Sequence, residues 1–108
     1  MQIRKTYKEV SPELLNAEIK DFVLKQGVIL GESKLETYTL PDESASFVSR
    51  GTMTFKSADK ECLRVHMVGS ARTETKLMID VDENLFPKEK LAALQSDLDF
   101  IFGAYEAK

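Results

Sequence analysis

Cysteine and histidine, which form many catalytic pairs, metal sites and covalent cross-links, are scarce in this sequence. Its 108 residues include one cysteine, one histidine and no tryptophan. A single cysteine cannot form a disulfide within the chain, and a lone thiol suits a reducing compartment. The first residues, MQIRKTYK, carry charges where a signal peptide would need an apolar stretch. We therefore expect a cytoplasmic protein.

Long apolar runs and an excess of one charge are missing as well. No apolar run approaches the ~20 residues that a helix needs to cross a bilayer, so we expect no membrane span. The 15 basic and 18 acidic residues give a formal net charge of −3 and are interspersed along the chain. Proteins that bind nucleic acid usually carry a basic surface, so we expect no nucleic-acid partner.

Short motifs that indicate a cofactor or a metal are also missing. The glycines of GVILGE match neither the phosphate-binding loop nor the dinucleotide-binding pattern G-x-G-x-x-G. The acidic segment DVDEN lacks the central glycine and the closing glutamate of a calcium loop. We therefore expect no cofactor, no metal site and no catalytic residue that the sequence alone can name.

The first clear element that the sequence does contain is a helix over SPELLNAEIKDFVLKQG. Ser11 is a favoured N-cap residue, Pro12 fits the first helical position, and Gly27 is placed to end the helix. The apolar residues recur at helical spacing, which predicts that one side of the helix is buried. These residues are Leu15, Ile19, Phe22 and Val23.

Extended segments flank this helix. Residues 3–10 alternate loosely, with Ile3, Lys5 and Tyr7 on one side, which indicates a short strand. Residues 28–40 are also extended, with a break near 31–33, so that they form either one strand or two. PDESAS, residues 41–46, is typical of a turn.

Three strands with one apolar and one polar face follow from residue 47. KSADK and GSAR separate them as turns, and the strict period of two predicts an antiparallel meander that is covered on one face only. The apolar face includes Gly51, Met53, Phe55, Leu63, Val65, Met67, Leu77, Ile79 and Val81. The other face includes Val48, Arg50, Thr52, Cys62, Arg64, His66, Val68, Lys76 and Met78.

A last amphipathic helix begins at Pro87 and supplies a second cover for the apolar face. Its stripe consists of Leu91, Leu94, Leu98, Ile101, Phe102 and Tyr105. The sequence therefore predicts one α+β domain over residues 1–108. We expect a two-layer sandwich, in which a helix from the N-terminal half and a long C-terminal helix pack on one face of an antiparallel four- to six-stranded meander.

The only cysteine and the only histidine, Cys62 and His66, lie four positions apart on one predicted strand. At that spacing their Cα atoms are roughly 13 Å apart, whereas a nucleophile and its base need to approach to ~3 Å. The register that keeps the apolar faces together places Thr52 and Lys76 beside His66, and Lys56 and Asp80 beside Cys62. Neither set resembles a catalytic triad or a zinc site.

The order of these elements resembles the helix-grip fold of START-related and plant-allergen-like domains. The resemblance rests on GTMTF, on TETKLMIDVDENLFP and on LAALQSDLDFIFGAYEAK. It implies that an apolar ligand is held between the sheet and the C-terminal helix. This chain is shorter than those domains, and its helices can instead pack directly on the sheet.

Three functions are consistent with these patterns. The first is a non-catalytic module that binds an apolar small molecule, in a pocket walled by Gly51, Met53, Phe55, Val65, Met67, Leu98 and Phe102. The second is a homodimeric interaction domain that uses the uncovered sheet face, around Val48, Val68 and Met78, or an unpaired edge strand. The third is an enzyme, which would require His66 or Tyr105 beside a carboxylate in a cleft.

Overall fold

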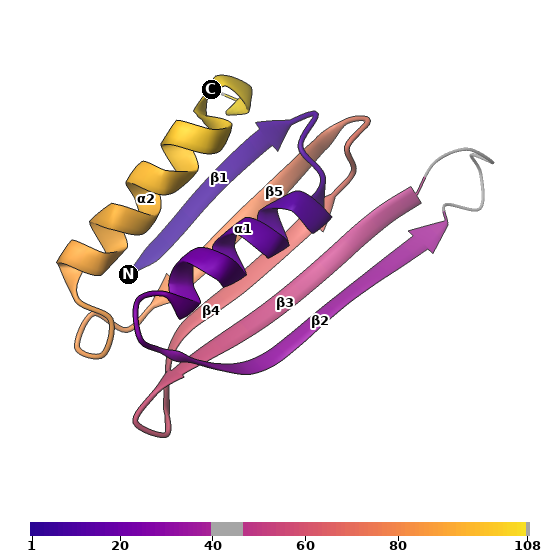
Figure 1. Ribbon diagram of the computed structural model, residues 1–108. Coiled ribbons are helices and arrows are strands. Elements are labelled where there is room, and N and C mark those ends of the chain that lie inside the picture. The colour runs from indigo at the N-terminus through magenta and orange to yellow at the C-terminus, as the bar shows by residue number, and fades with distance from the viewer. Residues whose placement is uncertain (40–46, 108) are drawn as a thin grey trace.

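The computed structural model describes residues 1–39 and 47–107, and this part of the chain forms five strands and two α-helices (Figure 1). The elements in chain order are β1 (Gln2–Lys8), α1 (Pro12–Leu24), β2 (Ile29–Thr39), β3 (Phe47–Ser57), β4 (Lys60–Gly69), β5 (Glu74–Val81), α2 (Lys88–Phe102) and the 3-10 turn η1 (Gly103–Tyr105). The turn predicted at 41–46 lies outside the described residues.

The sheet has the strand order β1-β5-β4-β3-β2, and all neighbouring strands are antiparallel. Strands β2 to β5 form the predicted meander. The first strand, β1, pairs with the last, β5, so that β2 is left at the opposite edge. The predicted α+β class and antiparallel sheet are therefore confirmed.

Both helices pack on the same face of the sheet, which we call the inner face; the opposite face is the outer face (Figure 1). Alternate residues of β1, β3, β4 and β5 are buried under the helices, whereas β2 contributes no buried residue. Tyr7 and Phe102 join β1 to α2, with ring centroids 5.8 Å apart. The α2 stripe is narrower than predicted, because Ile101 and Tyr105 are 40% and 48% exposed. The buried residues of α2 are Leu91, Leu94, Leu98 and Phe102.

Helix α1 begins and ends as its sequence predicts. The backbone N–H of Leu14 donates to Ser11 Oγ over 3.1 Å, which satisfies one of the free N–H groups at the helix start. Pro12 is the first helical residue, and Gly27, three residues beyond the helix, has a φ of 89° that favours glycine.

Strand β2 is continuous, and the predicted break within it is a β-bulge. The register with β3 shifts between Leu30 and Ser33, so one additional residue of β2 is accommodated there. The backbone N–H of Glu32 donates to Thr54 Oγ1 over 2.9 Å and fixes the bulge to β3.

A second register shift changes the position of the cysteine. Lys56 pairs with Glu61 while Phe55 pairs with Leu63, so Cys62 is the additional residue in β4. Its side chain is 1% exposed and belongs to the core. The prediction that Cys62 faces outward beside Lys56 was therefore wrong, because a bulge interrupts the alternation that the prediction assumed.

Candidate functional site

The residues predicted to wall a pocket come together in the hydrophobic core. The side chains of Met53, Phe55, Val65, Met67, Leu98 and Phe102 are at most 7% exposed and belong to one buried cluster. A Cβ atom at Gly51 would lie 3.1 Å from both Leu35 Cδ1 and Met67 Cγ. The space that Gly51 leaves on the inner face is therefore filled by two side chains of the protein itself.

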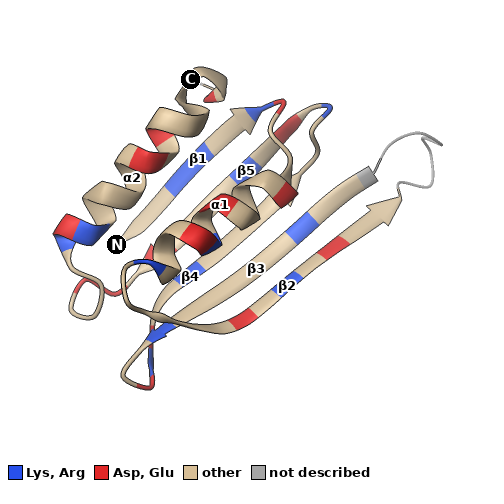
Figure 2. Cartoon of the chain, in the orientation of Figure 1, with Lys and Arg blue, Asp and Glu red and all other residues tan. Residues whose placement is uncertain are grey.

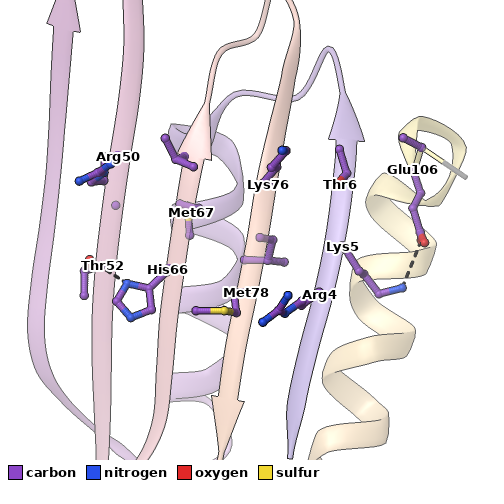
Figure 3. A pocket seen from close by; sticks show the side chains of 14 residues that line it. Arg4, Lys5, Thr6, Arg50, Thr52, His66, Met67, Lys76, Met78 and Glu106 are labelled. Atoms are coloured by element: carbon purple, nitrogen blue, oxygen red, sulfur yellow. Dashed lines mark hydrogen bonds and ion pairs between the residues drawn. The ribbon is translucent and has the colours of Figure 1, made fainter.

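An open hollow of about 810 Å³ lies on the outer face of the sheet instead. It extends from β3 across β4 and β5 to β1 and residues 106–107, and α1 lies behind the sheet in this view (Figure 3). Two rows of outward side chains cross it, one residue from each strand. The first row is Arg50, Val68, Lys76 and Thr6; the second is Thr52, His66, Met78 and Arg4.

Two apolar side chains lie in the floor of the hollow beside His66, and the surroundings of the floor are basic. Val68 and Met78 are half-buried on neighbouring strands, while Arg4, Arg50 and Lys76 are exposed around them. Neighbouring strands are about 4.8 Å apart, so Arg50 and Lys76, two strands from each other, have backbones roughly 10 Å apart. An anion over Val68 is within reach of both long side chains.

These three basic side chains lack an acidic partner within 4.0 Å in residues 1–39 and 47–107. Arg4 Nε donates to Gln2 Oε1 over 2.7 Å, which orients its guanidinium group without neutralising it. Glu36 is opposite Arg50 in the register, but it pairs with Lys34 Nζ at 3.1 Å and accepts a hydrogen bond from the Tyr38 hydroxyl. Within residues 1–39 and 47–107, Arg50 therefore forms no ion pair of its own.

Other basic side chains near the hollow are neutralised within the molecule. Lys5 Nζ lies 3.2 Å from Glu106 Oε1 and 3.4 Å from Asp99 Oδ1. Partial burial alone would lower the pKa of Lys5, but the two carboxylates outweigh it and raise that pKa above its usual range. Arg64 makes two hydrogen bonds to Glu61, of 2.7 and 3.2 Å. Lys5 and Arg64 therefore differ from the three basic side chains of the hollow, which have no acidic partner in the part of the chain that the structure describes.

His66 lies in the floor of the hollow, and its surroundings differ from those of a catalytic base. Its Nδ1 is 3.3 Å from Thr52 Oγ1, which confirms the predicted neighbour on β3 (Figure 3). Its neighbour on β5 is Met78 and not Lys76, because the actual register differs by two residues from the predicted one. Cys62 faces the core while His66 faces outward, so the two residues lie on opposite sides of the sheet.

The sequence contained part of the signal for this site. The alternation in β3, β4 and β5 placed Arg50 and Lys76 on the uncovered face, together with Val68 and Met78. It did not place Arg4 near them, because that depends on the pairing of β1 with β5. The charges on β1, β3 and β5 can be followed in Figure 2, where the basic residues are blue.

Comparisons with protein-family models, with curated proteins and with solved structures found no match to this chain. Within residues 1–39 and 47–107, no helix is long and apolar enough to cross a membrane. The same part of the chain contains no group of three or more histidine, cysteine or acidic residues that could hold a metal ion. The candidate site therefore has to be judged from its own geometry.

Proposed function

We propose that this protein is a non-catalytic binding module that holds a small amphipathic anion in the outer-face hollow. The observation that carries the proposal is the position of Arg4, Arg50 and Lys76, three basic side chains without an acidic partner in the described residues, around the apolar floor. A carboxylate or phosphate head group would bind these side chains. The apolar part of the ligand would lie on Val68 and Met78.

The basic side chains of the hollow differ in sign from the protein as a whole. The formal net charge is −3, so these three basic side chains, which have no acidic partner in the described residues, are opposite in sign to the molecule that carries them. Basic groups gathered on one face attract anions and raise their local concentration. Arginine also binds carboxylate and phosphate through two parallel hydrogen bonds, which gives the site geometric selectivity.

The size of the hollow fits a small ligand. Sites for small molecules usually measure roughly 300–1,000 Å³ and combine apolar walls with a few polar groups. The hollow has about 810 Å³ and this composition. Because it spans four strands but only a few residues along each strand, a single compact anion fits it better than a long polyanion. We place the module in the cytoplasm, where a lone buried thiol remains reduced.

A ligand between the sheet and α2, as the helix-grip resemblance implies, is the second candidate. The buried cluster of Met53, Phe55, Val65, Leu98 and Phe102 supplies an apolar surface for it. Such a ligand would have to displace contacts within the core, since these side chains already pack on one another. The outer-face hollow needs no such rearrangement, and we therefore prefer it.

A titration followed by amide NMR distinguishes the two locations. Decanoate serves as the amphipathic anion, inorganic phosphate as the head group alone, and decyl maltoside as a neutral chain. We expect decanoate to shift the amides of Arg50, Val68 and Lys76, with weaker shifts from phosphate and none from the maltoside. Shifts centred on Leu98 and Phe102 would place the ligand inside the core, and no shift with any probe would refute the module.

A pair of variants tests the role of charge. Arg50→Gln combined with Lys76→Gln removes two basic groups of the hollow, and we expect the decanoate Kd to rise about tenfold or more, since a hydrogen bond to a charged group is worth roughly 1.5–3 kcal/mol. Lys60→Gln combined with Lys88→Gln is the matched control, because both residues are exposed and outside the hollow. An equal loss of affinity in both would indicate a net-charge effect.

A further inference from the structure

The two edges of the sheet differ in how they are protected. At the β1 edge, Tyr7 and Glu106 form an isolated antiparallel β-bridge, and the backbone N–H of Ala107 donates to Thr6 O over 2.7 Å. At the opposite edge, β2 runs for 11 residues with β3 as its partner on one side. No segment of residues 1–39 and 47–107 pairs with its other side. A long unpaired edge offers backbone groups to a further strand.

The charges along β2 alternate in sign. Glu32, Lys34 and Glu36 follow one another at every second position, as the red, blue and red segments of Figure 2 show. Lys34 is exposed and Glu36 is half-buried on the outer side. They lie on either side of Leu35, which points inward and is 38% exposed. A basic and an acidic residue placed symmetrically about one position form a self-complementary pattern.

We propose that β2 pairs antiparallel with β2 of a second copy of this chain, with the two-fold axis passing through Leu35. In this arrangement Lys34 lies opposite Glu36 of the second copy, and Glu36 lies opposite its Lys34. The two leucines meet at the axis on the inner side. The product is a continuous ten-stranded sheet, in which residues 33–37 of the two copies, beyond the bulge, form five residue pairs across the interface.

The charges select this register over its neighbours. Side chains on the same face must meet across an antiparallel pair, so the alternatives differ by steps of two residues. A slide of two in one direction places Lys34 opposite Lys34 of the second copy. A slide in the other direction places Glu36 opposite Glu36. Like charges directly opposite each other destabilise a strand pair, and unlike charges stabilise it.

The size of the contact sets the expected affinity. An interface made of one strand from each copy lies at the small end of specific interfaces, which bury about 1,200–2,000 Å² when stable. We therefore expect a dimer that dissociates in the micromolar range. Sedimentation velocity at low salt, between roughly 5 and 500 µM protein, would show a transition from monomer to dimer. A monomer throughout this range would overturn the proposal.

Charge reversal tests the register itself. In Lys34→Glu, positions 34 and 36 of β2 both carry carboxylates, and in Glu36→Lys both carry ammonium groups. Each variant alone should therefore remain monomeric. An equimolar mixture of the two should form a heterodimer, because every opposing pair is then unlike in charge. The double variant Lys34→Glu with Glu36→Lys should dimerise alone, since exchanging the two residues keeps the pattern self-complementary.

Controls separate this edge from other surfaces. Lys60→Glu makes the same charge change on the exposed β3–β4 hairpin and should leave dimerisation unchanged. Amide hydrogen exchange should show additional protection within residues 33–37 at high protein concentration. A dimer that survives both single reversals unchanged, or that protects a different segment, would contradict the β2 interface. Circular dichroism confirms that each variant remains folded.

Discussion

The two faces of the sheet are made by the same strands but carry different kinds of side chain. On β5, Thr75, Leu77, Ile79 and Val81 are at most 6% exposed beneath the helices, whereas the residues between them reach solvent. Burial of the inner face provides the main driving force for folding, because apolar area removed from water contributes about 25 cal/mol per Å². The outer face contributes less to stability, so its side chains are available for binding.

The largest effect that tests this difference comes from two adjacent residues of β5. Ile79 is fully buried on the inner face, and its neighbour Met78 is half-buried on the outer face. We expect Ile79→Ala to lower the free energy of unfolding by about 2–5 kcal/mol, because it leaves a cavity in the core. Met78→Ala should cost less than about 1 kcal/mol. Urea unfolding measures both.

A comparable loss in the free energy of unfolding for Ile79→Ala and Met78→Ala would contradict the difference in stabilisation between the two faces. It would mean that Met78 is covered in solution, for example by a second copy on the outer face. Measurement at two protein concentrations separates that explanation, because stability that depends on association rises with protein concentration.

Two glycines on the inner face provide the next test. A Cβ atom at Gly69 would collide with the carbonyl oxygen of Glu74 and with Thr75 Cα, which are backbone atoms of β5. At Gly51 the nearest atoms belong to the flexible side chains of Leu35 and Met67. We expect Gly69→Ala to destabilise the protein by about 1–3 kcal/mol and Gly51→Ala to change its stability by less than about 1 kcal/mol.

Thermal unfolding of the two glycine variants gives the answer, since both changes add one methyl group. A larger loss at Gly51 would show that Leu35 and Met67 cannot move aside. The inner face would then be packed more rigidly at that position than the flexibility of its side chains indicates.

The smallest effect concerns an acidic pair in the helix layer. A hydrogen bond with Asp97 raises the pKa of Glu18 above its usual range, with further contributions from burial and from the charges of Asp97 and Asp21. A raised folded-state pKa stabilises the protein below the unfolded pKa, and this stability is lost as the pH rises through the folded pKa. Glu18→Gln removes a group whose ionisation is unfavourable in the folded state, so above the folded pKa of Glu18 it should raise the Tm by a few degrees.

The pH dependence distinguishes this explanation from a general effect of charge. Near pH 4 the carboxyl of Glu18 is largely protonated, so the gain from Glu18→Gln should disappear. Glu89→Gln is a control of opposite sign, because Glu89 lies in the first turn of α2, where a negative charge is favourable. A gain that is equal at both pH values would exclude the repulsion between Glu18 and Asp97 as its cause.

The local elements could be predicted because their signals are local. Ser11, Pro12 and Gly27 set the limits of α1 through backbone chemistry, and the period of two in β3 to β5 identified the buried face. The class of fold follows, because the apolar face of these strands requires a cover and two amphipathic helices provide it.

The features that could not be predicted depend on long-range strand pairing, which these local patterns do not encode. The bulge at Cys62 follows from how β4 meets both β3 and residue 82, whose N–H donates to Cys62 O over 2.9 Å. The neighbour of His66 on β5 depends on the length that the β4–β5 turn requires. The group of Arg4 with Arg50 and Lys76 depends on the pairing of β1 with β5, which alternation within single strands does not specify.

The burial of Cys62 also has a practical consequence for labelling chemistry. Its side chain is 1% exposed, and burial raises the pKa of its thiol, so little reactive thiolate is present at neutral pH. It is the only cysteine in the chain. A cysteine introduced at an exposed position of β2 or of the outer face would therefore react selectively with maleimide dyes or spin labels. The wild-type background needs no prior cysteine removal for distance measurements between copies.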